Sequence, residues 1–398
     1  MRDDLAKQVA AYAREDAEYT ADLLQRIIRI PSPSCEEGRV IGLLAREMES
    51  LGPDEVFTDS IGNVVARYGR GKRVILYDSH VDTVGVGDRS CWTRDPFAAE
   101  RSDGIIYGRG ASDNKAGIAC MVAGLKILTR LAAAGDFTLY VVGIVQEEDC
   151  EGLALSSLME ERNIVPECVV LGECTDLAIN RGHRGRTEIE VVTHGKSCHA
   201  SAPERGDNAI YRMTPIVEGI KWMAEKLAGD PFLGKGSIAV TSIECSTPSR
   251  NAVPELCRIF IDRRMVPGDT RDSIAREIDQ IARFTGGEVA ITRYARASHK
   301  GLVQEREKFF PAWTLDEGSR AVARAGQACE ALFGRPPAVS KWVFSTDGNY
   351  SAGMRSIPTI GFGPGEERHA HAADDQVRVD DLWKAAAFYA AFPFVYSS

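Results

Sequence analysis

The sequence predicts an α/β fold in which a mostly parallel sheet is flanked by helices and interrupted by a smaller β-α-β-β-α-β domain. Up to residue 181, short apolar runs of the kind that parallel sheets bury alternate with helical patterns. Between residues 182 and 297 the strands alternate apolar and polar side chains, which is typical of antiparallel strands with one exposed face. Residues 298–398 return to the first pattern. We therefore expect one domain from 1–181 and 298–398, with a second domain inserted at 182–297.

Composition and charge favour a small-molecule substrate. The chain has 398 residues, 44% hydrophobic and 26% charged, and a formal net charge of -9. An acidic balance with scattered Lys and Arg argues against nucleic acid as a partner. Residues 1–25 lack the apolar segment of a signal peptide, and no window is apolar enough to span a membrane. The ten cysteines form no CxxC pair, so we expect reduced thiols in a soluble, cytoplasmic protein.

The first elements lead to one strand that organises the rest of the chain. Helices are predicted at 3–30 and 36–51, where apolar side chains recur at helical spacing and proline ends each pattern. Two short strands, 55–58 and 63–68, follow. The stretch VILYDSHVDTV at 74–84 then begins as a buried strand, because its first residues are β-branched and aromatic types.

That stretch carries two side chains of the kind that bind metal, His80 and Asp82. In extended backbone, residues i and i+2 point to the same face, so the imidazole and the carboxylate should emerge side by side. This arrangement suits a metal-binding histidine whose other ring nitrogen is oriented by a carboxylate. A histidine at a strand end is more often a solvated or core residue, so the metal interpretation depends on what later strands supply.

Two later elements supply a carboxylate each. Asp113 lies where a helix predicted at 116–133 begins, and a carboxylate there can cap the helix, bind metal, or do both with its two oxygens. Glu173 follows the buried run of the stretch at 168–176. Because parallel sheets bind ligands at the carboxyl ends of their strands, both carboxylates are candidates for the same site as His80.

Three consecutive acids, Glu147, Glu148 and Asp149, follow a strand predicted at 137–145. Such a run is usually a solvated loop, but here the preceding apolar strand anchors it at the edge of the core. Like charges held there repel one another, and a divalent cation would relieve the repulsion. Two neighbouring carboxylates could also divide the work, one binding metal and the other acting as general base.

The remaining elements fill the inserted domain and close the first one. In the insertion we expect strands at 186–194, 236–245, 255–264 and 287–293, with helices at 207–227 and 270–284. After it come a helix at 315–333, an apolar strand at 357–363, the loop GPGEERHAHAADD and a closing helix from 380. That loop adds His369 and His371 to the set of polar residues that follow strands.

The collected residues predict a metal site that catalyses hydrolysis. Two histidines with several carboxylates and no thiolate suit Zn²⁺, or its neighbours Mn²⁺ and Co²⁺. The ligands outnumber what one tetrahedral ion needs, which points to two ions bridged by a carboxylate. The candidate residues are His80, Asp82, Asp113, Glu147, Glu148, Glu173, His369 and His371.

Read in order, the motifs HVDTV, GRGASDNKAG, EED, GE and AHAADD resemble the M20 metallopeptidases over nearly the whole chain. This zinc-dependent aminoacylase and carboxypeptidase family includes acetylornithine deacetylase and succinyl-diaminopimelate desuccinylase. The resemblance implies a catalytic domain like that of zinc peptidases and a cis peptide bond between Asp113 and Asn114. It also implies that Asp113 bridges two zinc ions, that His80 and Glu173 complete one site and Glu148 and His371 the other, that Glu147 is the general base, and that Asp82 orients His80.

The inserted domain is similar to the family's lid and dimerisation domain, which implies a homodimer. His199 matches a histidine that reaches the active site, often across the dimer, and stabilises the oxyanion. Asn251 and Arg264 fall where the family contacts the substrate carboxylate, although a surface salt bridge is the alternative for Arg264. His183 and His194 have no counterpart, and we interpret them as ordinary sheet residues.

The chain departs from the family pattern at three positions. Asp375 stands where glutamate is common, Ala116 replaces a usual glycine, and His369 is an additional histidine. We assign the metal to His371 because AHAADD aligns best with the family's last motif.

The resemblance implies a metal-dependent amidohydrolase that cleaves an N-acyl amino acid or a related small amide. Glu173 in place of aspartate favours deacylases over aminopeptidases. A dipeptidase or carboxypeptidase, an N-carbamoyl amino acid hydrolase, and a bacterial subgroup of selenium-metabolism-linked hydrolases stay open. A non-catalytic binding relative would be expected to lack the base or the bridging ligand, and Glu147 and Asp113 are both present.

Overall fold

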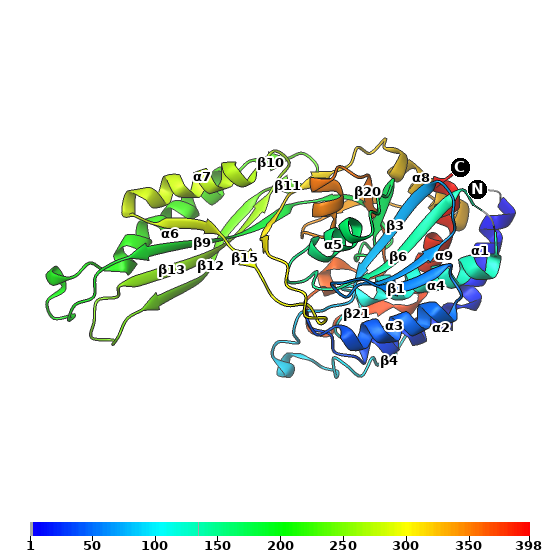
Figure 1. The fold of residues 1–398 in the computed structure, drawn as a ribbon, viewed down its shortest axis with the longest axis horizontal. Helices are drawn as coiled ribbons and strands as arrows, with labels where there is room; N and C mark the ends of the chain where they lie inside the picture. The colour runs from blue at the N-terminus through cyan, green and yellow to red at the C-terminus, as the bar shows by residue number, and fades with distance from the viewer. Residues whose placement is uncertain (1–2, 134) are drawn as a thin grey trace.

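The computed structural model describes residues 3–133 and 135–398 and has two lobes (Figure 1). The larger lobe contains the main sheet and both ends of the described chain. The smaller lobe is elongated and projects away from it. None of the described helices is long and apolar enough to cross a membrane.

The larger lobe is built on a nine-stranded sheet. Its four central strands run parallel, and antiparallel strands lie at both edges. The predicted fold class, a largely parallel sheet flanked by helices, is confirmed. In spatial order the strands are β1 (Glu55–Thr58), β2 (Val64–Tyr68), β6 (Phe137–Ile144), β3 (Arg73–His80), β7 (Cys168–Leu171), β20 (Thr359–Gly361), β8 (Ile179–His183) and β18 (Trp313–Thr314), with β19 (Val339–Trp342) also paired to β8.

The helices of this lobe pack mainly on one another and on the central strands. Helix α4 contacts β3, β6 and α9, and α9 also packs against α1 and α8. The single helix predicted at 3–30 is two helices, because the chain turns at Asp16, whose carboxylate pairs with Lys126 of α4 (2.7 Å). The helices are α1 (Asp3–Glu15), α2 (Ala17–Ile28), α3 (Gly38–Ser50), α4 (Lys115–Leu131), α5 (Leu153–Glu161), α8 (Arg320–Phe333) and α9 (Val379–Tyr396).

The smaller lobe has its own antiparallel sheet and its own hydrophobic core. Its sheet runs β12 (Ser237–Ser246), β13 (Leu256–Met265), β9 (Gly185–His194) and β14 (Glu288–Ile291), and β17 (Phe309–Phe310) adds a short pairing to β9. Helices α6 (Ala209–Lys226) and α7 (Arg271–Ala282) pack on it. In chain order this is β-α-β-β-α-β. The limits 182 and 297 stay a prediction, and β17 shows that a strand from beyond 297 joins the small sheet.

The long strands of the small sheet span the lobe from end to end. Gly185 of β9 pairs with Met265 of β13 at one end, and His194 pairs with Leu256 at the other. The ten residues of β9 therefore cover about 30 Å. The first end adjoins the larger lobe, since Arg186 of β9 bonds to Glu151 there.

Short strand pairs complete the fold. They are β4 (Arg101–Ser102) and β21 (Gln376–Arg378) on either side of β5 (Ile105–Tyr107), β10 (Gly229–Asp230) with β11 (Gly234–Lys235), and β15 (Arg293–Tyr294) with β16 (Arg306–Glu307).

Candidate metal centre

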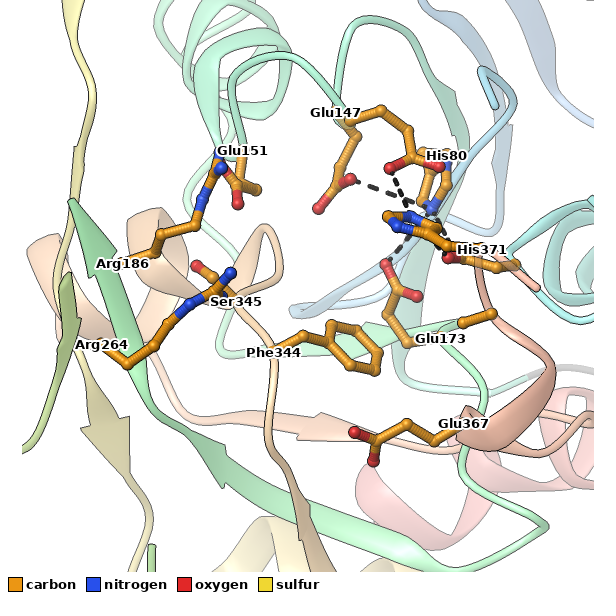
Figure 2. Close-up of a pocket in the computed structure, with 13 residues that line it drawn as sticks. His80, Glu147, Glu151, Glu173, Arg186, Arg264, Phe344, Ser345, Glu367 and His371 are labelled. Carbon is orange, nitrogen blue, oxygen red and sulfur yellow. Dashed lines mark hydrogen bonds and ion pairs between the residues drawn. The ribbon is translucent and has the colours of Figure 1, made fainter. Parts of the chain in front are cut away.

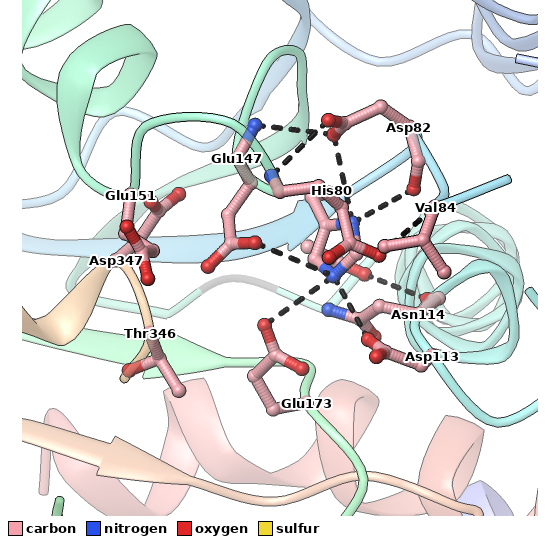
Figure 3. A network of polar contacts seen from close by, with 12 residues as sticks. His80, Asp82, Val84, Asp113, Asn114, Glu147, Glu151, Glu173, Thr346 and Asp347 are labelled. Atoms are coloured by element: carbon pink, nitrogen blue, oxygen red, sulfur yellow. Dashed lines mark hydrogen bonds and ion pairs between the residues drawn. The ribbon is translucent and has the colours of Figure 1, made fainter. Parts of the chain in front are cut away.

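Three neighbouring parallel strands bring the predicted acids to His80. Strand β3 ends at His80, which lies in register with the last residue of β6, and β7 ends beside it on the other side. The loop after β6 carries Glu147 and Glu148, and the loop after β7 carries Glu173. Residues that are far apart in sequence therefore meet at one edge of the sheet (Figure 3).

The distances around His80 describe a compact and buried cluster. Its Nε2 atom lies 3.0 Å from Oδ1 of Asp113, 3.5 Å from Oε1 of Glu173 and 3.9 Å from Oε2 of Glu147. All four side chains are less than a tenth exposed. Since burying several carboxylates is costly, such a cluster needs positive charge close by.

Asp113 faces both predicted histidines, one with each carboxylate oxygen. Oδ1 points to His80, and Oδ2 lies 3.3 Å from Nε2 of His371. The same His371 nitrogen lies 2.9 Å from Oε2 of Glu148. The peptide bond after Asp113 is cis, as expected. The cluster thus has two halves that share one carboxylate.

The electrostatics of the cluster follow from burial and mutual repulsion. Burial raises the pKa of Glu147 and of Glu173 well above the usual value, and the charges of neighbouring acids raise both further. Burial alone would lower the pKa of His80, but the charges of Glu173 and Glu147 raise it well above the usual range. Burial works against the ionised Asp113, yet hydrogen bonds from His371 and His80 hold its pKa low.

The residues present fit a divalent metal pair. Two groups offer ligand atoms within 4.8 Å of one another, His80 with Glu147 and Glu173, and His80 with Asp113 and Glu148. Oε2 of Glu173 is buried and has no hydrogen-bond partner among the described residues. Imidazole and carboxylate donors without thiolate suit Zn²⁺, Mn²⁺ or Co²⁺.

Asp82 contacts His80 differently from what the sequence suggested. Nδ1 of His80 lies 3.0 Å from the backbone carbonyl oxygen of Asp82 and 3.6 Å from its carboxylate. The carboxylate instead accepts the backbone N–H groups of Glu147 and Glu148, both at 3.2 Å, and the Ser34 hydroxyl at 2.6 Å. Asp82 therefore orients His80 chiefly through its backbone and fixes the acidic loop with its side chain.

The last loop places His371, and not His369, at the cluster. Nε2 of His369 lies 3.0 Å from the Gln376 side chain, outside the acidic cluster. Hydrogen bonds to Asp113 and Glu148 raise the pKa of His371 to about 10. This geometry favours His371 as the ligand.

Asp375 ties the loop of Asp113 to the loop of His371. It is fully buried and accepts the backbone N–H groups of Gly110 and Ser112, both at 2.8 Å. Burial raises its pKa to about 7. Asp375 thus makes a buried contact across the site.

A cavity of about 270 Å³ opens beside the cluster, and arginines lie on its other side (Figure 2). Arg264 of β13 lines this cavity and also pairs with Asp262 at 2.8 and 3.1 Å. The salt bridge named as the alternative is therefore present, and contact with a substrate carboxylate stays a prediction. Arg186 of β9, the partner of Arg264 in register, lines the cavity too. It bonds to Glu151 at 2.9 Å. Arg186 was not predicted, because in the sequence it looks like one more polar residue of an alternating strand.

His199 and Asn251 lie elsewhere. Both are exposed, in loops that follow β9 and precede β13, and the N–H of Ala200 donates to the Asn251 carbonyl (2.7 Å). Neither lines the cavity. His194, at the end of β9, lies about 27 Å along the strand from Arg186. Within one chain His199 and Asn251 are therefore not part of the site.

The fold and the centre agree with the comparison to protein families. The model of the peptidase family M20/M25/M40 matches residues 76–393, so the chain belongs to this family of hydrolases. The resemblance inferred from the motifs is confirmed.

Individual relatives cover almost the whole chain. The uncharacterized protein YgeY of Escherichia coli (strain K12) is 43% identical over 381 residues, 94% of each protein. Succinyl-diaminopimelate desuccinylase of Methylorubrum extorquens is 29% identical over 390 residues, 92% of this chain and 96% of that protein. The crystal structure of Bacillus subtilis YXEP, a dinuclear metal binding peptidase from the M20 family, shares the fold with a TM-score of 0.69 at 15% identity, covering 96% of this chain and 99% of that one.

Proposed function

We propose that the protein is a dimetal amidohydrolase that cleaves the amide bond of an N-acyl amino acid or a related small amide. The observation that carries the proposal is Asp113, whose two oxygens face two different histidines. A relative named as a desuccinylase and a structural neighbour described as a dinuclear metal binding peptidase support it.

Each half of the cluster would hold one divalent ion, most simply Zn²⁺. His80, Asp113 and Glu173 form one set of ligands, and Asp113, Glu148 and His371 form the other. Bound ions at such a site supply Lewis-acid chemistry, since they polarise a carbonyl and lower the pKa of a water molecule. The donor types also accept Mn²⁺ or Co²⁺.

Glu147 is the residue that would move the proton. Its backbone is held by Asp82, and its carboxylate reaches toward His80 from within the cavity wall. A carboxylate there can take a proton from the attacking water and deliver it to the leaving amine. Its presence argues against a non-catalytic relative.

The arginines on the far side of the cavity would bind the substrate carboxylate. Arg264 and Arg186 are each held by acids of the protein, Asp262 and Glu151, which orient the guanidinium groups toward the cavity. An oriented guanidinium is well matched to a carboxylate. Closure of the small lobe over the cavity would exclude water and complete the site.

We further propose a homodimer in which the small lobe meets a second copy. His199 and Asn251 are too remote to serve their own site, so a second copy is where they can act, on the oxyanion and the substrate carboxylate. Within the described chain β12 pairs with β13 alone, which leaves one edge of the small sheet open. Tyr211 and Trp222 of α6 are 76% and 64% exposed, as expected of an interface.

The thiols fit a reducing, cytoplasmic location, which we also propose. All ten cysteines are free. Cys245 and Cys257 face each other across β12 and β13, and the Cys245 thiol donates to the sulfur of Cys257 at 3.4 Å. Such a pair stays reduced where the cell keeps thiols reduced.

Amine release by the Zn²⁺- or Mn²⁺-reconstituted protein tests the activity. The panel contains N-acetyl, N-succinyl, N-formyl and N-carbamoyl amino acids together with dipeptides. We expect hydrolysis confined to one acyl class. Hydrolysis of dipeptides alone would move the protein to the peptidases, and no hydrolysis across the metal-loaded panel would overturn the proposal.

A further inference from the structure

One carboxylate that lines the cavity beside the metal centre is neither a proposed metal ligand nor an acid that pairs with Arg186 or Arg264. Glu367 lines this cavity and lies four residues before His371 in the same loop. Among the other acids of the cavity, Glu151 pairs with Arg186, and the rest belong to the cluster around His80 and Asp113. Glu367 forms no ion pair with any residue that the structure describes.

Arg184 acts on the Glu367 carboxylate through its charge but forms no ion pair with it. Its neighbour Glu366 pairs with Arg368 and with Arg378, both at 2.7 Å, so Glu366 is the acid that anchors the loop. Arg184 points its N–H groups at the carbonyl oxygens of Lys235 and Val343 (3.0 and 3.2 Å). Burial raises the pKa of the half-buried Glu367 carboxyl, while a backbone N–H and the charge of Arg184 lower it.

An aromatic ring stands next to this carboxylate. Figure 2 shows the Phe344 ring between Glu173 and Glu367, with Arg264 and Arg186 on the opposite side of the cavity. A cation gains from both partners, since it is attracted by the face of an aromatic ring and by a carboxylate that forms no ion pair. The two sides of the cavity therefore offer opposite charges to a ligand.

We propose that Glu367 and Phe344 form a subsite for a positively charged nitrogen group of the substrate, an ammonium or a guanidinium. The substrate class is then an amide that carries a carboxylate, for the arginines, and a cation, for Glu367. This inference rests on the proposed amidohydrolase function and narrows it.

Two matched pairs of compounds test the subsite. Nα-acetyl-L-lysine is compared with Nα-acetyl-L-norleucine, and glycyl-L-leucine with N-propionyl-L-leucine, because each pair differs in one ammonium group. We expect the charged member of at least one pair to have a kcat/KM about tenfold higher or more, the equivalent of about 1.4 kcal/mol. Glu367→Gln should remove that preference. Glu366→Gln, the same change one residue away, should keep it.

Binding separates a failed subsite from a failed function. Calorimetric titration of zinc-loaded Glu147→Gln protein with the four compounds, with and without Glu367→Gln, reports affinity without turnover. Tighter binding of a charged member that depends on Glu367 supports the subsite even if no compound is hydrolysed. Equal binding and turnover within both pairs, or a preference that survives Glu367→Gln, would overturn it.

Discussion

The two sheets of this protein place their polar residues in opposite ways. In the large sheet, parallel strands end side by side, so Glu147 and Glu173 both come within 3.9 Å of His80. In the small sheet, antiparallel strands send their loops to both ends, so Arg264 lines the cavity while His199 lies at the far end of the lobe. Residues that follow neighbouring strands are therefore brought together at one end of a sheet where the strands run parallel, and are divided between two ends where they run antiparallel.

Removing the proposed base from the metal centre should reduce activity more than any other change considered. Glu147→Gln keeps the shape of the side chain but cannot accept the proton, so we expect kcat to fall by about 10²- to 10⁴-fold. Metal content, measured by elemental analysis, should not change. Asp149→Asn is the matched control, because Asp149 belongs to the same acidic run but pairs with Arg296 instead. Undiminished turnover in Glu147→Gln would refute the assignment.

The second half of the cluster depends on one histidine of the last loop. We expect His371→Ala to lose one of two bound ions, because His371 is the histidine that faces Glu148 and Asp113. His369→Ala should keep both ions. Full occupancy in the His371 variant, or a lost ion in the His369 variant, would show that the assignments are reversed.

Mixing two variants tests whether His199, at the far end of the small sheet, acts in the active site of the other subunit. His199→Ala and Glu147→Ala damage different sites of a mixed dimer, so one intact site remains. Random reassociation should then restore about a quarter of wild-type activity. Glu147→Ala mixed with Asp113→Ala should restore none, because the two changes damage the same kind of site in each chain. No recovery in the first mixture would contradict a role for His199 across the dimer.

The smallest expected effect is on the pH dependence of stability, and it comes from His183, a histidine of the large sheet that lies outside the metal site. His183 is fully buried, and its Nδ1 accepts the N–H of Thr346 at 2.9 Å. Burial lowers its pKa from 6.5 to about 3, so the unfolded chain binds the extra proton between these values. The contribution of His183 to the free energy of unfolding is fully present above pH 6.5. Below pH 6.5 it should fall by up to about 1.4 kcal/mol per pH unit. Urea unfolding at several pH values gives the free energy of unfolding as a function of pH. Below pH 6.5 this dependence should be weaker in His183→Gln, by the amount that one bound proton accounts for. An equal pH dependence in the two proteins would contradict a neutral, buried His183.

The elements that carry the metal centre were predictable because their patterns are local. Strands β3, β6 and β7 are apolar runs, and α4 follows a glycine-rich turn, so the sequence places His80, Glu147 and Glu173 correctly at strand ends. Helix α5 was not predicted, because it is buried on nearly every side and shows no amphipathic period. Strand β8 is short and polar and gives no strand pattern.

The parts of the site that escaped prediction depend on contacts between distant segments. The link from the Asp82 carboxylate to the backbone of Glu147 joins two loops 65 residues apart. Arg186 and Glu367 reach the cavity only because the small sheet and the last loop fold against it. Periodicity and spacing cannot report such contacts.

Counting the bound metal ions shows whether Asp113 joins two metal sites. Metal-free protein is titrated with Zn²⁺ in a calorimeter, alongside Asp113→Ala, and bound metal is measured after dialysis. Because Asp113 faces both histidines, we expect two ions per wild-type chain and loss of the paired site in the variant. One ion per wild-type chain, or two ions held by Asp113→Ala, would contradict this expectation.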